Sequence, residues 1–169
     1  MNATLEAWNQ AGARAALDAM LACCGSRRWA TAMIGLRPIG SIAELSEAAD
    51  RVWNAMEESD WLEAFACHPR IGEDHSVHGN AQSATWSREE QSATGGAQKV
   101  VLQELAAGNL AYERQFGFTY IVCAMGKSAE EMLEILTRRL SAGKAEELRE
   151  AGEQQRQIMQ IRLGRWLAE

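Results

Sequence analysis

Helix signals recur along almost the whole sequence, and they constrain the fold more than any other feature. Three Ser-x-x-Glu tetrapeptides lie just ahead of stretches in which apolar residues return every three or four positions, namely Ser41–Glu44, Ser87–Glu90 and Ser128–Glu131. In such a capping box the serine and the glutamate satisfy each other's backbone N–H groups, so each tetrapeptide predicts the start of a helix. The second predicts the longest helix, ending near Gln115, and a last helix is expected from about Lys144 to Leu167.

One β-like run stands out, Phe-Thr-Tyr-Ile-Val-Cys-Ala at 118–124. A single short strand cannot form a sheet, so we expect a buried extended connector between helices. The 169 residues contain two prolines and no low-complexity linker, and a chain of this length can bury a core of its own. The prediction is therefore an all-α protein, a single-domain helical bundle over residues 1–169.

A long loop without periodicity is predicted at 68–86, where Pro69, Gly72 and Gly79 interrupt the helical pattern. Long loops are uncommon in compact helical domains and are often functional. His68 opens this loop. Because histidine can give or take a proton near neutral pH, His68 is a candidate catalytic acid or base, and a hydrogen-bonded structural histidine is the alternative.

Glu90 closes the second capping box, and two interpretations of it stay open. It can simply cap the helix by accepting from the Ser87 N–H. A helix N-terminus also presents unpaired N–H groups and the positive end of the helix dipole, which favour an anionic or carbonyl-rich ligand. In that case Ser87, Glu90 and Gln91 would line one polar patch.

Arg162 lies four residues after Ile158 and four before Trp166 on the expected last helix, so it shares their apolar face. A guanidinium in an apolar stripe needs a partner, because burial of an unpaired charge is costly. The structural alternatives are a buried salt bridge or a stem that reaches to water. The functional alternative is a fork that grips a carboxylate or a planar urea.

A metal site is a further alternative in the same loop. His68, Glu73, His75 and His78 are chemically capable ligands, which would suit a metal-dependent hydrolase. The His-x-x-His spacing differs from the zinc-protease motif, in which the two histidines lie four apart on a helix. No Cys-x-x-Cys pair occurs, and no glycine motif for phosphate or dinucleotide binding. We therefore expect no metal and keep the hydrolase as an alternative.

The charge balance and the N-terminus limit partners and location. The net charge is −6, from 17 basic and 23 acidic residues, which argues against nucleic-acid or anionic-membrane binding. The sequence begins without a basic start followed by an apolar run, and no stretch approaches the roughly 18 apolar residues of a membrane span. A cytoplasmic location is therefore expected.

Five segments occur in an order and spacing that match one protein family. They are Phe-Ala-Cys-His-Pro-Arg-Ile-Gly at 65–72, Trp-Ser-Arg-Glu-Glu-Gln-Ser at 86–92, Phe-Gly-Phe-Thr-Tyr-Ile-Val-Cys-Ala at 116–124, Arg-Arg-Leu at 138–140 and Ile-Arg-Leu at 161–163. Together they make the chain resemble the OHCU decarboxylases, the 2-oxo-4-hydroxy-4-carboxy-5-ureidoimidazoline decarboxylases, in a bacterial-type form.

The resemblance implies a role for each matching residue. It makes His68 the catalytic histidine with Pro69 beside the substrate, Glu90 the catalytic carboxylate, and Arg162 the arginine that holds the substrate. Ser87 and Gln91 align with substrate-contacting residues. Backbone groups are implied to contact the ring and ureido arm along one run, namely Tyr120, Ile121, Val122, Cys123 and Ala124.

The resemblance also implies an all-helical, usually dimeric fold and a reaction without a cofactor. The expected reaction releases CO2 from the ureidoimidazoline formed after urate oxidation and leaves (S)-allantoin, with His68 as proton donor. Besides the metal-dependent hydrolase, a non-enzymatic helical interaction domain is the other alternative. It would explain capped amphipathic helices without any site.

Overall fold

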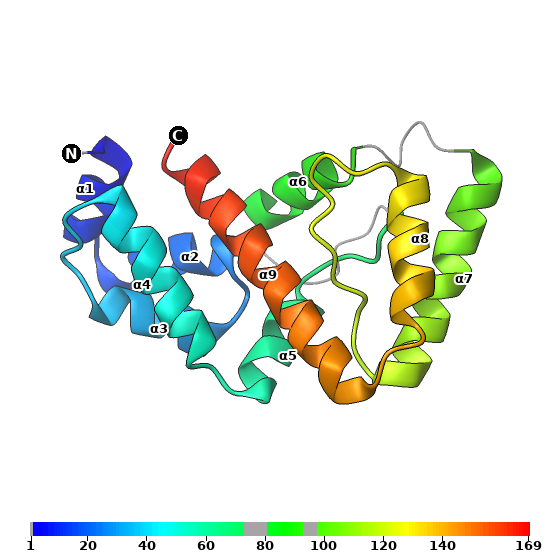
Figure 1. Ribbon diagram of the computed structural model, residues 1–169. Coiled ribbons are helices and arrows are strands. Elements are labelled where there is room, and N and C mark those ends of the chain that lie inside the picture. The colour runs from blue at the N-terminus through cyan, green and yellow to red at the C-terminus, as the bar shows by residue number, and fades with distance from the viewer. Residues whose placement is uncertain (1, 73–80, 93–97) are drawn as a thin grey trace. The chain divides into compact units, whose positions relative to one another are not determined.

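The computed structural model describes residues 2–72, 81–92 and 98–169, and within these ranges it contains helices and no β-strand (Figure 1). This confirms the predicted all-α class. In chain order the helices are α1 Ala3–Gln10, α2 Ala13–Cys23, α3 Arg27–Gly35, α4 Ile42–Asn54, α5 Glu58–Ala66, α6 Ala81–Glu90, α7 Lys99–Phe116, α8 Ala129–Arg139 and α9 Lys144–Trp166. In the described part of the chain, none of them is long and apolar enough to cross a membrane.

The chain divides into two compact units, each described here by itself. The first consists of the residues up to Ala64 together with Arg156–Glu169, and the second is Phe65–Gln155. Helix α9 contributes residues to both units. The expectation of a single domain stays a prediction.

Tryptophans build the core of the first unit. Trp8 and Trp29 are almost fully buried, and their indole N–H groups donate to backbone carbonyls, of Ala16 at 3.0 Å and Ala49 at 3.1 Å. A buried tryptophan needs such a partner, so these bonds fix both rings. The ring of Trp8 also meets Trp166 of α9 edge-on, with centroids 6.0 Å apart.

Aromatic side chains build the core of the second unit. Helix α7 packs against α8, and Tyr112 of α7 meets Phe118 and Tyr120 of the segment that follows edge-on, while Phe116 meets Phe118 with tilted rings. That segment, 118–124, is neither helix nor strand, and all of it except Thr119 is buried. The expected buried connector is therefore present.

Two of the three predicted capping boxes begin helices. Ser128 and Glu131 form the complete reciprocal box at the start of α8. At α4 the Ser41 hydroxyl accepts from the Glu44 N–H at 3.1 Å, while the Glu44 carboxylate accepts from Gly40 instead of Ser41. A serine cap alone therefore starts the helix in both cases, because its hydroxyl needs only an N–H group of the next turn.

The prediction at Ser87–Glu90 is wrong. These residues form the last turn of α6, and the following helix, α7, begins only at Lys99. The predicted loop 68–86 is correspondingly shorter, since 81–86 are helical, and the longest described helix is α9 with 23 residues. The error has a physical reason: serine and glutamate three apart also share one face inside a helix.

Candidate functional site

His68 lies directly after α5 in the second unit. Its backbone N–H donates to the Phe65 carbonyl at 3.1 Å, and this bond closes the last turn of the helix. Pro69 then prevents helix from continuing, because the residue before a proline is pushed out of the helical region. His68 and Pro69 are both half-buried, so the imidazole is neither sealed in the core nor fully in water.

An ion pair fixes the residue that follows Pro69. The Arg70 guanidinium donates to both carboxylate oxygens of Glu113 on α7, at 2.7 and 2.8 Å. These bonds hold the pKa of Glu113 below its ordinary value, against the opposing effect of partial burial. Paired bonds of this kind restrict direction as well as distance.

Two further bonds hold the backbone of the same loop. The Asn109 side chain on α7 donates to the Ile71 carbonyl at 2.9 Å, and the Gly72 N–H donates to the Gln91 side-chain oxygen at 3.0 Å. Gln91 follows the end of α6 directly. The structure therefore links the His68 loop to Gln91.

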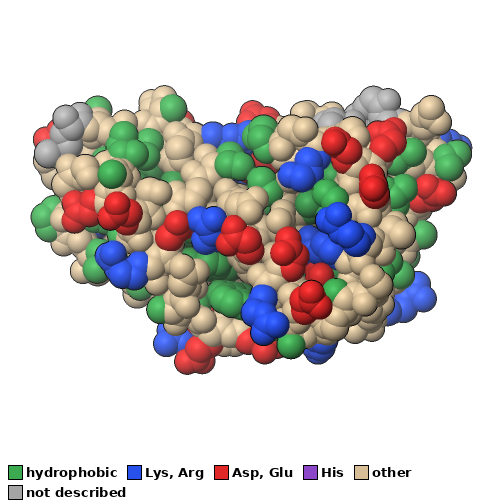
Figure 2. Space-filling view, in the orientation of Figure 1, with side chains coloured by type: hydrophobic (Ala, Val, Ile, Leu, Met, Phe, Trp, Pro, Cys, Tyr) green, Lys and Arg blue, Asp and Glu red, His purple; other side chains and the backbone are tan. Residues whose placement is uncertain are grey.

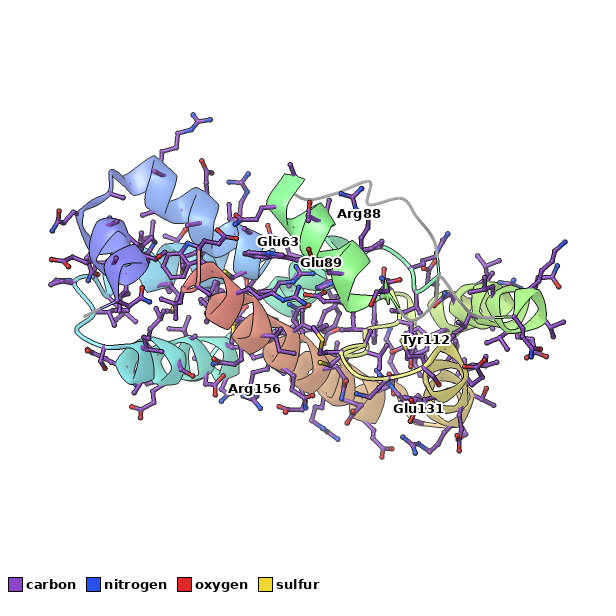
Figure 3. All side chains as sticks on the ribbon, turned by 90° about the horizontal axis from the view of Figure 1, so that it is seen from above. Glu63, Arg88, Glu89, Tyr112, Glu131 and Arg156 are labelled. Carbon is purple, nitrogen blue, oxygen red and sulfur yellow. The ribbon has the colours of Figure 1, made fainter. Side chains whose placement is uncertain are left out.

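Helix α6 turns a polar face inward. Ser83, Ser87 and Glu90 lie four and three residues apart, so they share one side of the helix, and they are 5%, 3% and 9% exposed. The neighbours Arg88 and Glu89 are exposed on the same helix (Figure 3). Binding sites for small molecules place a few polar groups in an otherwise buried setting, so this polar face makes α6 a candidate lining of such a site.

The structure corrects the electrostatic part of the Glu90 prediction. Glu90 is the last residue of α6, so the helix end beside it is the carbonyl end with the negative pole of the dipole. A ligand at this end would not meet the unpaired N–H groups of a helix start. The candidate patch of Ser87, Glu90 and Gln91 therefore offers side chains and not a helix N-terminus.

The connector 118–124 approaches this patch through Cys123. Burial raises the pKa of the Cys123 thiol, the Met125 N–H and the Lys127 ammonium oppose that rise, and the charge of Glu90 adds to it. Glu90 is thus close enough to influence Cys123 directly. The thiol itself stays protonated at neutral pH and is no nucleophile.

Side chains of the protein engage three backbone groups of the connector. The Ile121 carbonyl accepts from Arg139 at 2.7 Å, and the Cys123 carbonyl accepts from the Lys127 ammonium at 2.8 Å. The Cys123 N–H donates to the Gln154 side chain at 2.8 Å. These groups serve the fold, which narrows the backbone contacts that the resemblance implied for Tyr120–Ala124.

Arg139 belongs to a buried charged cluster that the sequence analysis did not single out. Its Nε donates to Glu147 at 2.7 Å, and the Tyr112 hydroxyl donates to the same carboxylate oxygen. The guanidinium lies over the ring of Tyr120, 4.9 Å from its centroid. Burial lowers the pKa of Arg139, but the bond and charge of Glu147 together with Tyr112 and Tyr120 outweigh burial, so the net shift is upward and the arginine stays charged.

Arg162 lies in the other compact unit, on the predicted face of α9. It is 3% exposed, between the buried residues Ile158 and Trp166, as expected. Its charge opposes the rise that burial causes in the pKa of Cys23 on α2, which places the two side chains near each other. His68 belongs to the second unit, so a site shared by Arg162 and His68 belongs to the proposal below.

The metal alternative depends on Glu73, His75 and His78, which lie outside the described residues. Within 2–72, 81–92 and 98–169, no three histidine, cysteine, aspartate or glutamate side chains gather in a way that could hold a metal ion.

Acidic and basic side chains are intermixed over the face seen in Figure 2, without a broad basic stripe on that face.

Comparison with known proteins places the chain in a family. The helices define an all-α protein, and the sequence model described as OHCU decarboxylase matches residues 9–164. The chain belongs to the OHCU decarboxylase family.

Two curated relatives take part in urate breakdown. The chain is 37% identical over 149 residues to the uric acid degradation bifunctional protein TTL of Arabidopsis thaliana, covering 88% of this chain and 46% of that protein. It is 24% identical over 150 residues to the uric acid degradation bifunctional protein PucL of Bacillus subtilis strain 168, covering 88% of this chain and 29% of that one. The chain thus spans less than half the length of both.

Two solved structures share the fold. A crystal structure of OHCU decarboxylase in the presence of (S)-allantoin matches with a TM-score of 0.76 and 33% identity, covering 90% of this chain and 99% of the other. A crystal structure of (S)-allantoin synthase matches with a TM-score of 0.71 at 18% identity, covering 96% of this chain and 53% of the other, and supports the fold alone.

Proposed function

We propose that this chain decarboxylates 2-oxo-4-hydroxy-4-carboxy-5-ureidoimidazoline to (S)-allantoin and CO2, without a cofactor. Membership of the OHCU decarboxylase family supports the reaction. The observation that carries the site is the buried polar face of α6, with Glu90 close to the connector and Gln91 bonded to the His68 loop. A homodimer in the cytoplasm is part of the same proposal.

The chemistry needs few groups. The substrate carboxylate sits on a ring carbon beside a C=N bond, which accepts the electron pair when the bond to CO2 breaks. Because that sink is part of the substrate, no pyridoxal or thiamine is required. Loss of CO2 from a carboxylate consumes one proton, which must reach one face of the carbon that becomes the (S) centre.

In this proposal His68 donates that proton and Glu90 assists the transfer. Pro69, Ser87 and Gln91 contact the substrate, together with backbone groups of the 120–124 run, and Arg162 grips its carboxylate or ureido group. An aligned acid–base group typically contributes about 10²–10⁴-fold to the rate. His68→Asn in a folded protein should therefore lose most of the turnover.

The test generates the unstable substrate in situ from urate with the two preceding enzymes and follows circular dichroism. We expect rapid appearance of the (S)-allantoin signal, unaffected by a chelator. Glu90→Gln should lower the rate on the order of 10²-fold or more, while Glu89→Gln, the exposed neighbour on the same helix, serves as the matched control.

Each alternative has its own outcome. Loss of activity with a chelator would favour the metal-dependent hydrolase that uses the loop histidines. No acceleration over spontaneous racemic decay would favour a helical interaction domain. Near-normal turnover of His68→Asn would leave the reaction in place and remove His68 as its proton donor.

A further inference from the structure

A single peptide unit, the one between Ile71 and Gly72, connects α7 to the residue that follows α6. Its carbonyl accepts from the Asn109 side chain on α7 at 2.9 Å, and its N–H donates to the Gln91 side chain at 3.0 Å. All four residues belong to the second unit. The peptide is trans, so its carbonyl and its N–H point in opposite directions. The planar peptide therefore bridges two side chains, with one hydrogen bond at each end.

This bridge joins the two segments that carry the proposed acid–base groups. His68 lies three residues before Ile71 on one side, and Glu90 directly precedes Gln91 on the other. Gly72 has a φ of +84°, a left-handed conformation that a glycine adopts without the strain of a side chain. The orientation of the Ile71–Gly72 peptide therefore determines how the His68 loop meets the end of α6.

Asn109 carries an amide at a position where packing alone favours an apolar side chain. The residue is 1% exposed, and its amide oxygen is buried without a hydrogen-bond partner among the described residues. Burial of an unpaired acceptor costs stability, so the oxygen contributes nothing favourable to the core. The amide nitrogen makes the bond to the Ile71 carbonyl. The contribution of an amide at this position is thus its bond to the loop backbone.

A second contact between α7 and the loop is of a different kind. Glu113, four residues after Asn109, binds the Arg70 guanidinium, and both of these side chains are partly exposed. That pair acts at the end of a long side chain, whereas Asn109 bonds a main-chain carbonyl directly. Asn109 therefore restrains the backbone itself, three residues from His68.

We infer that Asn109 is a positioning residue: through the Ile71–Gly72 peptide it fixes the His68 loop relative to the end of α6. This rests on the proposed function, in which His68 and Glu90 move the proton. Asn109 is buried and acts through the loop, so it is assigned no contact with the substrate. A misplacement of about 1 Å can cost a catalytic group on the order of 10²-fold in rate. Loss of the Asn109 bond should therefore affect the chemical step more than substrate binding.

Hydrogen exchange in the wild type measures the bridge directly. Gly72 is exposed, so its N–H would exchange freely with water unless it were bonded. We expect its exchange to be about tenfold slower or more than in an unstructured peptide, because Gln91 accepts from it. Exchange at the unprotected rate would overturn the inference without any variant.

The variant that tests the role of Asn109 is Asn109→Leu, which keeps a branched side chain of similar size and removes the amide donor. Gln103→Leu, at an exposed position on the same helix, is the matched control. We expect Asn109→Leu to remain folded by circular dichroism, with kcat and kcat/KM lowered together about tenfold or more and KM within about threefold. Gln103→Leu should behave as the wild type.

A second readout does not depend on turnover. The imidazole signals of His68 in a nitrogen-15 spectrum, identified by their absence in His68→Asn, report the surroundings of the ring. In Asn109→Leu these signals should shift, and the Gly72 N–H should exchange about tenfold faster or more, because release of one end of the peptide weakens the bond at the other. Both should be unchanged in Gln103→Leu. If Asn109→Leu does not fold, Asn109→Ser replaces it, since the shorter side chain does not reach the Ile71 carbonyl.

The outcomes are distinct. An unchanged kcat in Asn109→Leu, or a raised KM with an unchanged kcat, would overturn the inference and leave the proposed decarboxylase in place. Unchanged His68 signals in that variant would overturn it in the same way. A wild type without activity, in which Asn109→Leu still shifts the His68 signals, would overturn the proposed function and support the link between Asn109 and His68.

Discussion

Replacing Arg70 by methionine, and Glu113 by glutamine, tests whether the ion pair between them steadies the His68 loop. The two side chains are 35% and 26% exposed, so water screens the pair in part. Its geometry is bidentate, at 2.7 and 2.8 Å. For a part-exposed pair of good geometry we expect a coupling free energy of about 0.5–1 kcal/mol at pH 7.

The pH dependence has a definite sign. Arg70 lowers the pKa of Glu113 below its ordinary value of 4.5 in the folded chain. The pair therefore contributes its full stability above that value, and loses it as the pH falls through the lower, folded-state pKa. Urea unfolding of the wild type, both single variants and the double variant at pH 7 and at about pH 3 measures the coupling.

The same variants report on the site. Arg70→Met should also lower kcat/KM, because the residues next to His68 lose a fixed direction and small misplacements of a catalytic group are costly. Glu104→Gln, an exposed glutamate on the same helix as Glu113, is the control. A coupling of zero at pH 7, or one that does not change on acidification, would refute the reasoning.

Two further substitutions test individual features of the fold by urea unfolding. Gln155→Leu should raise the free energy of unfolding by about 1–2 kcal/mol. This glutamine is fully buried, and neither its amide oxygen nor its amide nitrogen has a hydrogen-bond partner among the described residues. A lower free energy of unfolding would show that the amide is hydrogen-bonded in solution. Gly117→Ala should lower it by about 1 kcal/mol, because Gly117 ends α7 with φ +85° in otherwise open space, and an unchanged value would contradict that account.

Local signals carried the successful part of the sequence analysis. The starts of α4 and α8 and the span of α9 follow from serine caps and apolar periodicity, which act within one or two turns of chain. The buried connector followed from the same reasoning, since one short apolar run has no sheet to join. The buried position of Arg162 followed from helical spacing alone.

Helix α6 was not predicted from the sequence because its inward face is polar. Apolar periodicity assumes that buried positions are apolar, and here Ser83, Ser87 and Glu90 occupy them. One signal was available: these residues repeat at helical spacing around Trp86, which is itself buried. Read as a polar stripe, that spacing predicts a helix over this stretch instead of a helix start at Ser87.

The sequence did not predict the contacts of Arg139, Glu147 and Gln154 for a different reason. Gln154 meets the connector backbone 31 residues away in sequence, and Arg139 meets it 18 residues away. Contacts at these separations produce no periodic pattern in the sequence, because they form only when the helices pack together. A charged residue at an apolar position of a helix is visible in the sequence, but the backbone group that it will meet is not.

These contacts share a common cause. Two irregular segments of the second unit, the loop around Arg70 and the connector, carry backbone groups that helices would have paired internally. Burial of such backbone requires polar side chains from the surrounding helices, and Asn109, Arg139 and Gln154 meet that need.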